Sequence, residues 1–192
     1  MFGVRRIVAL FCLAIVAPGL AQCARAQSGG PPWSALVDPV GAGEIVLGRV
    51  CLTGIAERRS IAELAHHEYL VAVPPRDAGA GASDEVWRLA SVDPVYAVAW
   101  TDGSCTTSVQ GGPSDKLRLM AERVILARPE RFVLRSSRVV GTGQFDRAIY
   151  CGQAGGAPIA ATISTPHDVA RGGFTSTVYS AGPGDLCYRA QG

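Results

Sequence analysis

The chain has 192 residues, with 18 basic and 16 acidic side chains and a formal net charge of +2. Hydrophobic residues make up 48% of the sequence, enough for a folded core, which argues against a disordered chain. The near balance of charge argues against nucleic-acid binding by the domain as a whole, because phosphate binding needs a surplus of cations on at least one face.

Residues 1–26 carry the three parts of a cleavable signal peptide. A basic start with Arg5 and Arg6 precedes an apolar run from Ile7 to Leu20, and residues 24–26 form a small-x-small cleavage site. The run of about 14 residues is shorter than the ~20 that cross a bilayer core as a helix. We therefore expect an exported chain, periplasmic or secreted, with no transmembrane segment.

A second processing route exists in principle at Cys23. Leu20-Ala21-Gln22-Cys23 is similar to the lipobox of bacterial lipoproteins, but Gln22 stands where that motif has Gly, Ala or Ser. We therefore expect cleavage after Ala26 rather than a lipid anchor at Cys23. Cleavage leaves 15 basic and 16 acidic side chains.

Three helices are predicted after a leader segment over residues 27–43. The first covers residues 44–55, where apolar residues recur at helical spacing. A capping box at Ser60-Ile61-Ala62-Glu63 starts the second, which we expect to run until Pro74. The third covers residues 114–128 and is stopped by Pro129.

Strands are predicted where β-branched and aromatic runs lie between turn residues. These runs cover residues 86–92, 95–101, 104–109, 132–140, 144–151, 159–164 and 174–180, with a surface loop over 76–84. The connections are too short for parallel crossovers. The sequence therefore predicts an α+β fold over residues 44–192, a single two-layer domain with about three helices on an antiparallel sheet.

Four cysteines remain after the signal peptide, at positions 51, 105, 151 and 187. An even number in an exported chain predicts two disulfides, and the sequence alone allows three pairings. We favour Cys51 with Cys105 and Cys151 with Cys187, because the second bridge would hold a glycine-rich C-terminal segment in place. Without a Cys-x-x-Cys spacing, neither a zinc knuckle nor a redox pair is indicated.

The sequence has a recognisable layout of three features. These are Val50-Cys51-Leu52 on an early helix, Trp87 on a strand and Cys105 on a later strand. Over residues 45–110 it resembles small uncharacterised exported proteins of Gram-negative bacteria. The resemblance implies an extracytoplasmic location and supports the pairing of Cys51 with Cys105. It implies no activity and no functional residues.

Metal and cofactor motifs are incomplete in this sequence. Glu63 and His66 are half of a carboxylate-bridged di-metal pattern whose other half is absent, and their surroundings do not match zinc protease spacing. The glycine pairs near residues 155 and 172 lack the setting of a phosphate-binding loop. We therefore expect no metal and no cofactor.

The one catalytic alternative is a small hydrolase that uses His167 and Asp168 with Ser164 nearby. A histidine with a carboxylate can activate a hydroxyl group. However, the chain has no Gly-x-Ser-x-Gly motif, and adjacent residues on one segment rarely face each other. We therefore expect a non-enzymatic role.

Basic residues gather in one part of the chain. Residues 27–113 hold 5 basic and 10 acidic side chains, whereas residues 114–147 hold 8 basic and 4 acidic ones. This split predicts a cationic surface for an anionic envelope component or an acidic protein. Arg135 and Arg138 fall on opposite faces of a strand, so only one can join the helix cations. The candidate binding residues are Lys116, Arg118, Arg123, Arg135 and Arg138.

The alternative for this span is internal pairing with the acidic N-terminal half of the domain. Taken together, the sequence favours an envelope binding or interaction domain, with the hydrolase as the other hypothesis.

Overall fold

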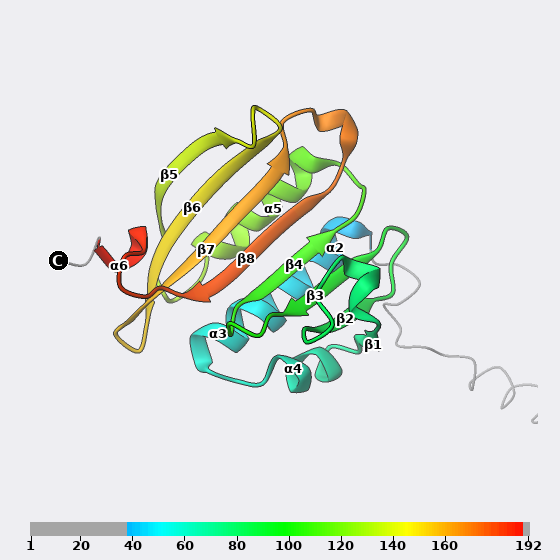
Figure 1. The fold of residues 1–192 in the computed structure, drawn as a ribbon, viewed down its shortest axis with the longest axis horizontal. Helices are drawn as coiled ribbons and strands as arrows, with labels where there is room; N and C mark the ends of the chain where they lie inside the picture. Colours follow the sequence, from blue (N-terminus) through cyan, green and yellow to red (C-terminus); the bar gives the residue numbers. More distant parts are fainter. Residues whose placement is uncertain (1–37, 190–192) are drawn as a thin grey trace, which may run out of the picture. The chain divides into compact units, whose positions relative to one another are not determined.

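The structure is a computed structural model that describes residues 38–189 (Figure 1). The predicted signal peptide, Cys23 and the leader up to residue 37 lie outside the described residues. The domain is α+β, as predicted, with one eight-stranded antiparallel sheet.

The first helix begins earlier than predicted. It runs from Pro39 to Glu57 as three consecutive parts, α2 (Pro39–Ile45), the π-helical η1 (Val46–Leu52) and α3 (Thr53–Glu57). The Asp38 carboxylate accepts hydrogen bonds from the backbone N–H groups of Val40 and Gly41, and Pro39 suits the first helical position. The start predicted at residue 44 was therefore wrong, because this cap recruits residues 39–43 into the helix.

By length and composition alone, the helix from Pro39 to Glu57 could cross a membrane, whereas the sequence predicted no transmembrane segment. Its apolar residues instead form the centre of the domain's core. Val46, Leu47, Val50 and Leu52 have no exposed surface. Their burial explains the apolar composition of this helix.

The second helix, α4 (Ile61–His67), starts as predicted and ends early. The Ser60 hydroxyl accepts a hydrogen bond from the Glu63 backbone N–H at the N-cap. Tyr69 then adopts a left-handed conformation with φ of 62°, which ends the helical path. The chain continues as a short strand, β1 (Val71–Val73), where the sequence predicted further helix.

The sheet consists of two meanders that meet along their last strands. The order is β1-β2-β3-β4-β8-β7-β6-β5, so β4 and β8 are neighbours in the middle. The remaining strands are β2 (Glu85–Leu89), β3 (Val95–Ala99), β4 (Cys105–Val109), β5 (Val133–Val140), β6 (Phe145–Ala154), β7 (Ala157–Pro166) and β8 (Phe174–Ser180).

One face of the sheet is covered by the first helix and by α5 (Ser114–Leu126), which lie behind the strands in Figure 1. We call this the helix-covered face. Gly43 lets the two helices approach closely, because a Cβ atom there would lie 2.9 Å from Met120 Cε. The main core fills the space between these helices and the sheet.

Both predicted disulfides are present. Cys51 in η1 is bonded to Cys105 at the start of β4, with a Cα–Cα distance of 5.2 Å, so the central helix is tied to the sheet. Cys151 in β6 is bonded to Cys187 in the short helix α6 (Leu186–Arg189), with a Cα–Cα distance of 5.1 Å. Two disulfides indicate an oxidising, extracytoplasmic compartment.

The opposite side of the sheet, which we call the open face, is covered by the described residues only at its two ends. At one end, Ala78 from the 3-10 helix η2 (Pro75–Ala78) and Ala80 pack over Val86, Tyr96 and Val98. At the other end, α6 packs over residues that include Cys151 and Ala160. The middle strands are left accessible between these two covers.

Candidate functional site

A single row of directly opposed residues crosses the open face. Strand register places these residues side by side on successive strands from β5 to β2. The row consists of Arg138, Arg147, Ser164, Thr175, Ser108, Tyr96 and Arg88. We call the part from Arg138 to Ser108 the arginine–hydroxyl row, because Tyr96 beyond it is buried under the η2 segment.

The hydroxyl groups of the arginine–hydroxyl row are available to a ligand. Ser164 accepts a hydrogen bond from Arg147 Nε at 3.3 Å, and the Thr175 and Ser108 hydroxyls bond to no other described residue. Thr175 is exposed, and Ser164 and Ser108 are partly exposed. With strands ~4.8 Å apart, Arg147 and Ser108 are about 14 Å apart across the sheet.

The two arginines at the end of the row have no acidic partner among the described residues. Arg138 on β5 and Arg147 on β6 are exposed and directly opposite each other. Like charges in this position repel each other. Asp146 and Val139 point to the helix-covered face instead, since side chains alternate along each strand. An anion on the open face would therefore relieve this repulsion.

A second row of hydroxyl groups lies beside the first and is internally bonded. Trp100 Nε1 donates a hydrogen bond to Thr106 Oγ1 at 2.8 Å, and the Thr106 and Thr177 hydroxyls are 2.8 Å apart. Thr162 donates to the Thr177 backbone carbonyl at 3.4 Å. These bonds fix the side chains on the floor of the open face.

A hollow of about 480 Å³ adjoins this second row. Its wall includes Thr177, Tyr179 and two carboxylates, Asp102 and Asp185. Burial and the hydrogen bond to Asp185 raise the pKa of Tyr179 to about 12, so its hydroxyl stays protonated and donates to Asp185 at 3.0 Å. Hydrogen bonds from Ser104 lower the pKa of Asp102. This end of the face therefore presents anionic acceptors, unlike the arginine end.

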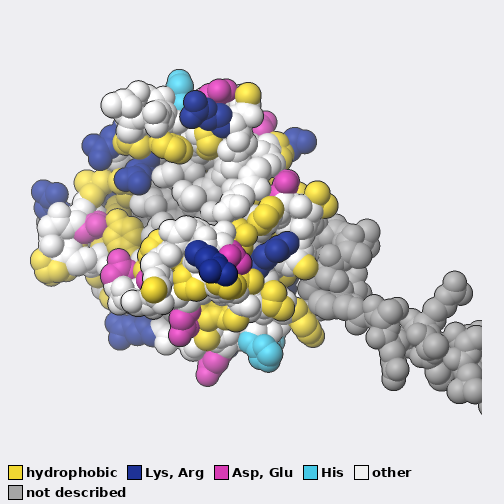
Figure 2. Space-filling model, turned by 45° about the vertical axis from the view of Figure 1, so that its right-hand side comes forward, with side chains coloured by type: hydrophobic (Ala, Val, Ile, Leu, Met, Phe, Trp, Pro, Cys, Tyr) yellow, Lys and Arg dark blue, Asp and Glu magenta, His cyan; other side chains and the backbone are white. Residues whose placement is uncertain are grey.

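Figure 2 shows the open face turned partly toward the viewer. Its centre is hollowed, and the floor of the hollow is white, the colour of uncharged polar side chains and backbone. Hydrophobic and basic side chains surround the floor. The face thus offers a polar surface between covered ends.

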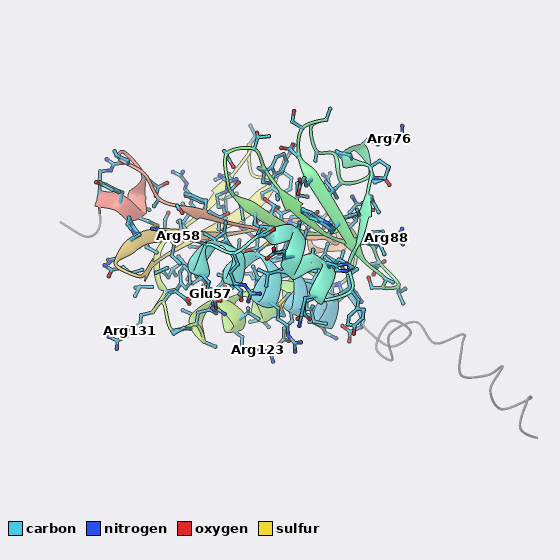
Figure 3. All side chains as sticks on the ribbon, turned by 90° about the horizontal axis from the view of Figure 1, so that it is seen from below. Glu57, Arg58, Arg76, Arg88, Arg123 and Arg131 are labelled. Atoms are coloured by element: carbon cyan, nitrogen blue, oxygen red, sulfur yellow. A yellow bond between two sulfur atoms is a disulfide. The ribbon has the colours of Figure 1, made fainter. Side chains whose placement is uncertain are left out.

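The cations predicted on α5 lie on the other side of the molecule. Arg118 Nε is 3.0 Å from Glu122 Oε1, and Arg123 Nη2 is paired with Glu44 from α2. Lys116 is exposed on the same helix. Figure 3 shows Arg123 on the helix side and Arg88 on the sheet side. The five predicted residues are therefore not contiguous, because the sheet separates Arg138 from α5.

Arg135 lies at a bulge in β5, between Leu134 and Ser136, where strand alternation is interrupted. It lines a hollow of about 440 Å³ together with Arg131, Gln153 and the Cys151–Cys187 bridge. Whether any of the five residues binds an anion stays a prediction.

Several arginines of the arginine-rich span form ion pairs with carboxylates of the same domain. Arg128 Nε and Nη2 each lie 3.0 Å from a different oxygen of Glu130, and Nη1 donates to the Thr53 hydroxyl at 3.4 Å. The Arg123–Glu44 pair joins the span to the acidic N-terminal half, as the alternative hypothesis expects. Arg118 and Arg128 instead pair with carboxylates inside the span.

The residues of the hydrolase alternative are not brought together. His167 Nδ1 lies 3.2 Å from Asp146 Oδ1, not beside Asp168. The Asp168 carboxylate accepts a hydrogen bond from the Ala170 backbone N–H. Ser164 points to the open face, whereas Asp146 points to the helix-covered face. The geometry thus gives His167 a carboxylate but no serine nucleophile at Ser164.

No group of three or more His, Cys, Asp or Glu side chains within residues 38–189 could hold a metal ion. Glu63 and His66 lie on α4, as predicted, without further ligands of this kind.

Apart from Ser164, which the hydrolase alternative named for another role, the hydroxyl residues of the open face were not predicted from the sequence. The signal that could have found them is a period-two pattern of Ser and Thr in the strands around residues 106–108, 162–164 and 175–177. Such hydroxyl groups are common on solvated strands. Only the strand register shows that β4, from an earlier part of the chain, aligns its hydroxyl groups with those of β7 and β8.

Comparisons with protein-family models, curated proteins and solved structures found no match to this chain.

Proposed function

We propose that the protein is a non-enzymatic binding domain of the bacterial envelope, periplasmic or secreted after cleavage of its signal peptide, and that its open face binds an acidic glycan. The arginine–hydroxyl row is the observation that carries this proposal. It combines cations that have no carboxylate partner among the described residues with accessible hydroxyl groups.

Arg138 and Arg147 fit the acidic groups of such a ligand. A guanidinium group binds a carboxylate through two parallel hydrogen bonds, and these charge-assisted bonds are stronger than neutral ones. No carboxylate of the described residues competes for either side chain. A bound uronic acid would therefore remove the repulsion between the two arginines.

Ser164, Thr175 and Ser108 fit the neutral parts of a glycan. Each hydroxyl can donate one hydrogen bond and accept others, which matches a ligand whose own groups are mostly hydroxyls. The ~14 Å between Arg147 and Ser108, from the strand spacing, leaves room for more than one sugar unit. The hollow beside Thr177 could receive further hydroxyl groups, since Asp102 and Asp185 accept hydrogen bonds there.

The helix-side cations are less suited to the same ligand. Arg118 and Arg123 are already bonded to Glu122 and Glu44, so an anion would have to displace a carboxylate from each. This difference supports the open face over α5 as the glycan surface.

Binding of the oxidised protein to oligogalacturonate and to its fully methyl-esterified form tests the proposal, because the ester removes only the charge. We expect the free acid to bind at least tenfold more tightly in low salt. Its affinity should fall as salt rises, since the Debye length shortens to about 8 Å near physiological ionic strength. Equal affinity for the two forms, or no binding of the acid, would contradict the proposal.

A further inference from the structure

The strand β5 forms a long edge of the sheet that no other described strand covers. It has eight residues, and none of them is fully buried. The opposite edge strand, β1, has only three residues. The sheet order leaves the outer side of β5 without a neighbouring strand from residues 38–189 (Figure 1). Unpaired backbone N–H and C=O groups on such an edge can bind an added strand.

Apolar side chains lie exposed on the helix-covered side of this edge. Leu134 and Val139 on β5 are 48% and 51% exposed. On α5, Leu119 and Leu126 are 64% and 54% exposed, and their spacing of seven residues places them on one side of the helix.

The apolar stripe of α5 is turned toward this edge of the sheet. Glu122, between Leu119 and Leu126, is close enough to Tyr150 on β6 to help raise the pKa of its hydroxyl. Tyr150 is directly opposite Leu134. In the other half of the domain, α4 packs against β2, with Leu64 and Trp87 in the core, but no described helix covers β5 in the same way.

The charged side chains on the edge strand β5 are all positive. Arg135 and Arg138 are the only charged residues in Val133–Val140, and neither is paired with a carboxylate among the described residues. Arg138 points to the open face, and Arg135 lies at the bulge. A strand added here would therefore meet cations along the edge and apolar groups on the helix-covered side.

We propose that β5 binds an extended segment of a partner protein in which acidic and apolar residues alternate. Its acidic side chains would contact Arg135 and Arg138, and its apolar ones Leu134 and Val139. A second copy of this chain fits less well, because antiparallel pairing about the centre of β5 would place Arg135 opposite Arg138 of the copy.

A labelled ten-residue peptide of alternating Glu and Val tests this inference against the oxidised protein. Fluorescence anisotropy should show saturable binding, and replacement of Glu by Lys in the peptide should weaken it at least tenfold. Hydrogen–deuterium exchange should show protection at residues 133–140 on binding. Absence of binding, or protection elsewhere only, would overturn the inference.

Two variants and two controls test whether the peptide binds at the β5 edge. Arg135→Glu and Leu134→Lys should each weaken binding at least tenfold, while thermal unfolding shows that the fold persists. Arg76→Glu reverses a charge on a side chain that is 88% exposed in the η2 segment and should leave binding within twofold. Arg147→Gln, which affects the proposed glycan site, should also leave it within twofold. Equal losses in all four proteins would show nonspecific binding and overturn the inference.

Discussion

Arg138 and Arg147 lie directly opposite each other on β5 and β6, and neither is bonded to a carboxylate among the described residues. Other arginines of the same span, Arg118, Arg123 and Arg128, each have a glutamate partner. The arginine-rich part of the chain is thus divided into cations neutralised on the helix side and cations left available on the sheet. This division locates the proposed binding surface.

The two disulfides are expected to stabilise the domain to a similar extent. They close loops of 54 and 36 residues. On the chain-entropy estimate each contributes about 4 kcal/mol. Replacing Cys51 and Cys105 together by Ala should lower the free energy of unfolding by about this amount, with an added cost for the cavity in the core. Chemical denaturation of the oxidised proteins measures the difference.

Peptide mapping under non-reducing conditions provides the control for this prediction. It should return Cys51 linked to Cys105 and Cys151 linked to Cys187, with no labelled thiol in the native mature domain. A linkage between Cys51 and Cys151 would contradict the structure.

Much of the fold follows from local signals, and the failures have local causes. Ser60 and Glu63 predicted the start of α4 correctly, because a capping box depends only on neighbouring residues. The earlier start at Pro39 was missed, since glycines at 41 and 43 suggested a loop although Asp38 and Pro39 are a good cap. The left-handed Tyr69 that ends α4 carries no such signal, because that conformation is uncommon outside glycine.

The candidate site depends on the register between strands, which was not predicted from the sequence. Thr106 and Thr177 share a hydrogen bond although 71 positions separate them. Composition correctly indicated a cationic span, but not that the sheet would separate Arg138 from Arg118. The proposed glycan surface is assembled from five strands, β5, β6, β7, β8 and β4, whose order is set by packing of the whole domain.

Arg128 is expected to be structural. Its side chain is 20% exposed and that of Glu130 is 9% exposed, and two hydrogen bonds join them. Arg128→Met leaves the Glu130 carboxylate buried without its partner and should cost about 3 kcal/mol of stability. Arg118→Met removes a more exposed pair on α5 and should cost only about 0.5 kcal/mol. Similar losses for the two variants in urea denaturation would show that burial of the Arg128 pair is unimportant.

Alkaline pH should destabilise the domain through two tyrosines. Burial raises the pKa of both Tyr150 and Tyr179 to about 12, and Glu122 and Asp185, respectively, contribute to the rise. A hydroxyl that ionises at pH 10 when unfolded and near 12 when folded stabilises the fold below pH 10. That stability is lost as the pH rises from 10 to 12.

The Tyr150→Phe variant separates this effect from general alkaline damage. Its stability should decline less between pH 10 and 12 than that of the unmodified protein, measured by urea denaturation at each pH. Ultraviolet titration of the folded protein should also show two tyrosines ionising later than the others. A pH dependence unchanged by Tyr150→Phe would mean that this hydroxyl titrates normally.

The most direct test of the binding surface compares two double variants with the same change of charge. Arg138→Gln with Arg147→Gln removes the cations of the arginine–hydroxyl row, and Arg118→Gln with Arg123→Gln removes two cations from α5. Affinity for oligogalacturonate is measured for both by isothermal titration calorimetry at low salt. If the open face binds the acidic glycan, the first variant loses at least tenfold in affinity and the second stays within about twofold of the unmodified protein. A loss confined to the α5 variant, or equal losses in both, would contradict the proposed site.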